Sequence, residues 1–338
     1  MEDRIASRLL SDEAASDFLE SQDKAYGKNQ EDNIPTQPRQ SLGQARSAQP
    51  QESSISSAND SFWKTIPLQN LPSGGLFYPD GAELSIRSAD VSEIRQWSTI
   101  DEGDILDVDD QLNFIIEKCT RFKINGGQMW LTWRDILEVD RLFIVFMIHE
   151  ITFPTGQNEL YAKFTCNSSC TGEEKFEDTL LVNSGMLQIF SLPEELMQWY
   201  SQDYKCFEVV STKLNDTWYL YMPTIGVIER LRKRIAEIRQ TGKNVDKAFI
   251  KYAPYIIQDW SKFGKREYSD LQMSSFAWHI NKFTFINEFV DQIQLARETS
   301  ILTGCPKCGS ILTTPLFSQS SFTIKNLFLI SGRLNELI

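Results

Sequence analysis

The sequence predicts an α+β protein with a mixed first part and a helical second part. Three observations favour this class. Apolar and polar residues alternate over 83–87 and 160–166, which is typical of half-buried strands. Apolar residues recur every three or four positions over 104–122 and across much of 223–300, which is typical of helices with one buried face. Two cysteine pairs lie far apart in the chain and indicate a metal site that joins these parts.

The first residues differ in composition from the rest. From Asp23 to Asp60 the chain consists mainly of Gln, Ser, Asn, Pro and Asp, with few large apolar residues. Such a segment cannot bury enough apolar surface to offset the entropy lost on ordering, so we expect residues 1–60 to form a disordered arm. Near the start of this arm, an apolar stripe predicts a short amphipathic helix, which either docks on a partner or frays in solvent. The stripe consists of Ile5, Leu9, Leu10, Phe18 and Leu19.

A small mixed α/β domain that contains the first cysteine pair is expected over 61–222. Pro and Gly-Gly mark its start, so Leu71–Gly75 and Phe77–Gly81 are predicted to form tight turns. Thr132 is followed three residues later by Asp135, the spacing of a helix capping box. The expected elements are a strand over 83–87, helices over 104–122 and 131–149, and strands over 160–166, 175–177, 206–210 and 218–222.

A helical domain is expected over 223–300, and the second cysteine pair with a C-terminal docking tail over 301–338. Ile228, Leu231 and Ile235 mark the apolar face of the first helix. The other expected elements are helices from Val245 to Trp260 and from Asp270 to Arg297, a strand or loop over 312–322, and a terminal helix or docking tail over 324–338.

The two cysteine pairs carry the most specific chemistry in the chain. Cys166 and Cys170 follow a Cys-x-x-x-Cys pattern. Cys305 and Cys308 follow a Cys-x-x-Cys pattern, and both spacings are usual for zinc ligands. Gly309 can adopt the open backbone angle that such a turn needs. Four thiolates close the coordination of the metal, so we predict a structural Cys₄ zinc ribbon that fastens the C-terminal part of the chain to its middle. The alternatives are disulfides or unrelated buried thiols.

Composition argues against several function classes. A formal net charge of −12 disfavours binding to DNA or RNA, including by a zinc-ribbon module, because nucleic acids attract basic surfaces. The sequence has no apolar run of the length that a membrane-spanning helix needs, and no glycine-rich nucleotide-binding motif. With 8 Trp and 21 Phe, the chain has enough aromatic area for a large core or an obligate interface with other proteins.

Candidate catalytic residues are few, and we predict that the protein is not an enzyme. His149 and His279 are its only histidines, which limits catalysis by histidine. An acidic cluster offers an alternative, a hydrolase in which paired carboxylates bind a metal. Acidic residues at the start of a helix more commonly stabilise the helix dipole, and this cluster lacks the spacing of a calcium-binding loop. The cluster consists of Asp101, Glu102, Asp104, Asp107, Asp109 and Asp110.

Two stretches carry a family resemblance. The first is LPSGGLFYPDGAELSIR, and the second, after an acidic helix, is VDRLFIVFMIHEITFPTGQNELYAKFTCNSSC. Together they cover about residues 66–177 and resemble the baseplate hub and hub-assembly proteins of contractile-tailed bacteriophages of the T-even type. The chain departs from that pattern at His149, where an Arg is expected, at Pro154–Thr155 before Gly156, and in the extra residue of the first cysteine pair. The matching positions are Leu71, Pro72, Ser73, Gly75, Tyr78, Pro79, Asp140, Phe143, Ile151, Thr152 and Phe153.

The resemblance implies a virion structural protein, a hub subunit that binds other tail proteins within a multi-subunit assembly. It implies a location in the tail baseplate of the virion, and in the host cytoplasm during assembly. The same resemblance allows an assembly factor or chaperone that does not remain in the virion.

Overall fold

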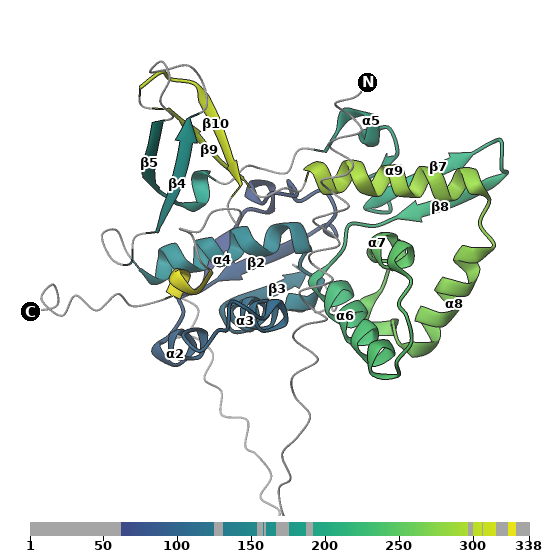
Figure 1. Cartoon of the computed structure of the whole chain (residues 1–338), viewed down its shortest axis with the longest axis horizontal. Coiled ribbons are helices and arrows are strands. Elements are labelled where there is room, and N and C mark those ends of the chain that lie inside the picture. The colour runs from purple at the N-terminus through teal and green to yellow at the C-terminus, as the bar shows by residue number, and fades with distance from the viewer. Residues whose placement is uncertain are drawn as a thin grey trace, which may run out of the picture.

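The computed structural model of the chain describes residues 62–124, 131–153, 158, 160–166, 176–186, 192–296, 300–305, 307–315 and 324–328. These residues form helices and small antiparallel sheets, which confirms the α+β class (Figure 1). The predicted disordered arm, with its amphipathic helix, lies outside the described residues. None of the described helices is both long and apolar enough to cross a membrane.

The N-terminal sheet has three short strands, β1 (Lys64–Ile66), β2 (Ala82–Ile86) and β3 (Thr120–Ile124), in the order β1-β2-β3. Helices α2 (Val91–Trp97) and α3 (Ile105–Cys119) connect β2 to β3. The predicted strand at 83–87 is thus confirmed, but the helix predicted over 104–122 ends earlier. From Thr120 the chain pairs with β2 instead, because this places Phe122 in the core opposite Leu84.

The helix predicted over 131–149 is divided in two. The predicted capping box forms around the 3-10 helix η3 (Trp133–Asp135). The chain is then extended before the main helix, α4 (Glu138–Thr152), begins. In this extended part, Ile136 O accepts a hydrogen bond from Ile225 N (2.8 Å). Backbone pairing with a distant segment therefore replaces helical hydrogen bonds, which the local sequence does not reveal.

Two β-hairpins lie side by side (Figure 1). One is formed by β4 (Tyr161–Cys166) and β5 (Phe176–Leu181), the other by β9 (Ser300–Gly304) and β10 (Ile311–Pro315). The strand predicted at 160–166 is confirmed. The strand predicted at 175–177 continues to Leu181, and the segment predicted as a strand or loop begins with a strand.

A third sheet consists of β6 (Tyr200–Ser201), β7 (Cys206–Ser211) and β8 (Asp216–Leu220), after the short helix α5 (Glu194–Met197). Strands β7 and β8, predicted at 206–210 and 218–222, pair as an antiparallel hairpin. Asn215 in its turn has a φ of 48°, a left-handed conformation that Asn tolerates. The buried face of the hairpin packs on the last long helix, with the rings of Phe207 and Phe289 4.9 Å apart.

The helical region consists of α6 (Ile225–Gln240), α7 (Lys247–Ile256), α8 (Lys265–Phe276) and α9 (Ile280–Ala296). The helix predicted to reach Trp260 ends at Ile256, and the long helix predicted from Asp270 to Arg297 is two helices. At the break between α8 and α9, the ring of Trp278 packs on Tyr252 of α7, with 5.3 Å between centroids. Tertiary packing of this large side chain outweighs the local helical pattern.

One hydrophobic core runs through these parts, from Ile66 in β1 to Phe328. Ion pairs to the buried carboxylate of Asp109 also connect them. Arg141 of α4 donates to Asp109 Oδ1 of α3 (2.8 Å), and Arg232 of α6 pairs with the same carboxylate. Burial lowers the pKa of each of these guanidinium groups to about 10. The mixed and helical parts of the chain therefore share both a core and a buried charge network.

Candidate metal centre

Three of the four cysteines predicted to bind a metal lie together where the two hairpins meet. Cys166 is the last residue of β4, Cys305 follows β9 directly, and Cys308 lies in the turn before β10. Their sulfur atoms all lie within 4.8 Å of one another. Cys170, the fourth predicted ligand, lies outside the described residues. The fold thus brings Cys166 next to Cys308, which is 142 positions away in the sequence.

The turn of the second hairpin holds its two cysteines in place. Gly309 N donates to Cys305 O (2.8 Å), and Cys305 N donates to Ser310 O (2.9 Å). Gly309 has a φ of 70°, which is the open backbone angle predicted for it and one that other residues rarely adopt. Cys308 Sγ lies 3.2 Å from Ser310 Oγ, close enough for this hydroxyl to stabilise a thiolate. Local backbone geometry therefore directs both sulfurs toward one point.

The spacing of the sulfurs fits a tetrahedral metal site. Zinc–sulfur bonds of about 2.3 Å place the ligands of a tetrahedron about 3.8 Å apart. The sulfurs of Cys166 and Cys308 are 3.8 Å apart, whereas a disulfide needs about 2.05 Å. Cys166 and Cys305 are buried, and Cys308 is exposed. The cluster could therefore hold a metal ion.

The remaining described cysteines are core residues. Cys119 and Cys206 are fully buried and lie apart from the cluster. Cys119 Sγ donates to Glu93 Oε2 (3.4 Å), as expected for a thiol in the core. Burial raises the pKa of Cys206 to about 11, which keeps its thiol protonated at neutral pH.

The acidic cluster that was the alternative metal site is divided among structural contacts. Asp104 caps α3, Asp109 pairs with Arg141 and Arg232, and Glu102 accepts a hydrogen bond from Lys325 N (2.8 Å). Within the described ranges, the cysteine cluster is the one group of three or more potential ligands with metal-binding spacing.

A buried carboxylate anchors the first turn of the mixed domain. Asp140, in the first turn of α4, is fully buried. It accepts hydrogen bonds from Ser73 N (2.8 Å), Ser73 Oγ (2.7 Å) and Tyr78 OH (2.7 Å). Burial raises the pKa of Asp140 to about 6, and the hydrogen bonds partly offset this rise. We call these three residues the Asp140 network. Periodicity and spacing did not reveal it, and its one signal in the sequence is that all three residues match the family pattern.

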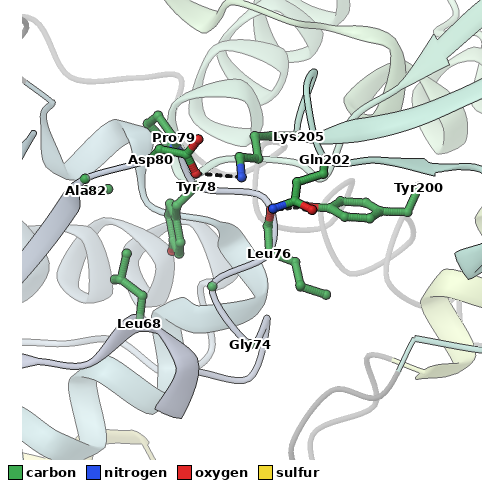
Figure 2. A pocket seen from close by; sticks show the side chains of 12 residues that line it. Leu68, Gly74, Leu76, Tyr78, Pro79, Asp80, Ala82, Tyr200, Gln202 and Lys205 are labelled. Atoms are coloured by element: carbon green, nitrogen blue, oxygen red, sulfur yellow. Dashed lines mark hydrogen bonds and ion pairs between the residues drawn. The ribbon is translucent and has the colours of Figure 1, made fainter.

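A surface cavity of about 330 Å³ lies between this turn and the β6–β7 turn (Figure 2). Lys205 Nζ lies 2.8 Å from Asp80 Oδ1 in its wall, and Tyr200 OH donates to Leu76 O (2.5 Å). These polar groups are paired with each other, and none of the residues that line the cavity is a cysteine. The cavity and the metal cluster are therefore separate.

No protein-family model, curated protein or solved structure matches this chain. The resemblance to baseplate hub proteins therefore rests on the sequence pattern.

Proposed function

We propose that the protein is a structural subunit of the baseplate hub of a contractile phage tail, which acts through protein–protein interactions on a zinc-stabilised fold. The Asp140 network carries this proposal. Ser73 and Tyr78, from the first stretch of the family pattern, donate to Asp140 from the second, although Ser73 and Asp140 are 67 positions apart. Two separated parts of the family pattern thus meet in one buried network. This is expected if the pattern reflects a shared fold, and it supports the resemblance.

Other positions of the pattern also have structural roles. Gly75 has a φ of 74°, and a Cβ atom there would lie only 3.1 Å from the backbone carbonyl carbon of Leu68. Leu71 is fully buried. Thr152 Oγ1, near the end of α4, accepts a hydrogen bond from Ala89 N (2.9 Å). These matching positions therefore contribute to the fold through tight packing, burial and hydrogen bonding.

We infer that the metal is zinc and that Cys170 supplies the fourth thiolate. Thiolates favour zinc, and four of them leave no open position for a substrate, so the site would be structural. The ion would fasten the C-terminal hairpin to the hairpin in the middle of the chain. Because metal binding is then coupled to folding, it would stabilise the protein without disulfides.

The proposed role is not catalytic. His279 Nδ1 accepts a hydrogen bond from Asn281 N (3.2 Å) at the start of α9. His149 Nε2 lies 3.2 Å from Asn158 O, and its ring packs on Phe328. Structural contacts of this kind favour a binding protein, and the net charge of −12 favours protein partners over nucleic acids.

The second candidate is an assembly factor that leaves the finished particle. Mass spectrometry distinguishes the two when the tagged full chain is produced during phage infection and both finished tails and assembly intermediates are purified. A fixed copy number in finished tails supports the hub subunit, located in the virion. Presence in cytoplasmic intermediates alone supports the assembly factor. Absence from both contradicts the proposal.

A further inference from the structure

The cysteines of the metal cluster differ in their exposure to solvent. Cys308, in the turn before β10, is exposed, whereas Cys166 and Cys305 are only 1% and 2% exposed. The two described cysteines outside the cluster, Cys119 and Cys206, are fully buried. Among the described cysteines, a small oxidant in solution therefore reaches Cys308 first.

The proposed metal would keep Cys308 in its reactive form. A cysteine that binds zinc is a thiolate, and thiolates are the form that peroxides oxidise. The hydroxyl of Ser310, 3.2 Å from Cys308 Sγ, is close enough to stabilise negative charge on the same sulfur atom. Exposure and negative charge are thus combined on one sulfur atom of the cluster.

A second sulfur atom lies in contact with this one. Cys166 Sγ, at the end of β4, is 3.8 Å from Cys308 Sγ. The S–S bond of a disulfide is about 2.05 Å long, so each sulfur atom has to move by roughly 0.9 Å. Shifts of this size lie within the range of side-chain rotation. Because Cys166 is shielded from solvent, it meets an oxidised Cys308 before it meets the oxidant itself.

We propose that a peroxide converts the metal cluster into a disulfide between Cys166 and Cys308. The thiolate of Cys308 attacks the peroxide and breaks its O–O bond, which gives a sulfenic acid and a hydroxide ion. The thiolate of Cys166 then attacks the oxidised sulfur atom. The S–S bond forms, the S–O bond breaks, and a second hydroxide ion leaves. The two sulfur atoms lose two electrons in total, and these electrons reduce the peroxide.

The disulfide changes what joins the two hairpins. Two of the thiolate ligands are consumed, so a bound metal ion would be released. The new bond still links the β4–β5 hairpin to the β9–β10 hairpin, which lie side by side (Figure 1). The hairpins would thus stay joined by the metal in reducing surroundings and by the disulfide in oxidising ones. Metal release rests on the proposed zinc site, whereas disulfide formation rests on the geometry of the cluster alone.

The first test identifies the disulfide in the unchanged full chain. The protein is treated with hydrogen peroxide, its remaining thiols are alkylated in denaturant, and its tryptic peptides are analysed by mass spectrometry. Trypsin cleaves after Lys307, between Cys305 and Cys308, so the peptides separate these two cysteines. Fragmentation of the linked peptide distinguishes Cys166 from Cys170. We expect Cys166 linked to Cys308. A bond between any other pair, or a Cys308 that remains reduced or ends as a sulfinic or sulfonic acid, overturns the proposal.

The second test follows the metal and the order of the two steps. A zinc-binding dye should detect about one ion released per disulfide formed. In Cys166→Ser the linked peptide should be absent, and the sulfenic acid of Cys308 should be trapped by dimedone. Cys206→Ser is the matched control, since Cys206 lies outside the cluster and this variant should form the disulfide like the unchanged chain. Zinc that stays bound after the disulfide forms contradicts the release. A chain that contains no zinc but forms the disulfide contradicts the proposed metal and supports the disulfide.

Discussion

Replacing Tyr78 by Phe removes one hydroxyl from the buried turn of the mixed domain. This hydroxyl donates to Asp140 Oδ2 (2.7 Å) and accepts a hydrogen bond from Leu137 N (3.1 Å). A lost hydrogen bond to a charged group costs about 1.5–3 kcal/mol, and the unpaired backbone N–H of Leu137 costs about 1–3 kcal/mol more. Tyr78 is only 3% exposed, so water cannot replace either partner. We expect the free energy of unfolding to fall by roughly 3–5 kcal/mol.

Equilibrium unfolding in urea, followed by tryptophan fluorescence, measures this change, provided that both proteins have the same denaturant slope. Tyr200→Phe is the matched control, since its hydroxyl donates to Leu76 O at a more exposed position. That variant should lose only about 1 kcal/mol. If Tyr78→Phe costs no more than Tyr200→Phe, the network does not hold the turn. The family resemblance would then lose this structural support.

In Cys305→Ser, the zinc content measured by plasma mass spectrometry should fall from about one ion per chain to nearly none. In Cys206→Ser it should not fall, because Cys206 lies outside the cluster. Equal content in the two variants would rule out the site. The pKa of Asp140 is raised from 3.8 to about 6, so its contribution to stability is fully present below pH 3.8 and is lost as pH rises through 6. This pH-dependent loss amounts to about 3 kcal/mol of unfolding free energy, and it should be absent in Asp140→Asn. An unchanged pH profile of unfolding in this variant would refute the assignment to Asp140. Burial lowers the pKa of His149 from 6.5, so the sign is opposite: its contribution is present above pH 6.5 and is lost as pH falls. The protection factor against hydrogen exchange at residues 324–328 should therefore fall in acid. The charged groups near His149 and this segment are Glu150 on the same helix, Glu102 and Lys325. In His149→Gln the protection factor should not fall.

The strands with a clear alternation of apolar and polar residues, such as those at 83–87 and 160–166, were predicted because one face of each is buried and successive side chains point to opposite faces. The short strands β1, β6 and β9 were not predicted, and β3 was predicted as part of a helix. Helix ends were predicted poorly. The helix that begins near Asp104 stops at Cys119 because the next residues pair with β2, and the long helix after Asp270 is interrupted where Trp278 packs on Tyr252. In both places a contact with a distant element is worth more than the local preference.

The sequence by itself determined the α+β class and the turn at Cys305 and Cys308, because spacing and a glycine with an open backbone angle are local properties. Only the tertiary structure decided that Cys166 lies against Cys308, that Asp140 binds Ser73, and that Ile324–Phe328 packs against α2 and α4. Each of these contacts joins residues far apart in the chain. Such contacts are set by how the whole core packs and by which buried polar groups must find partners, and neither can be read from a local pattern.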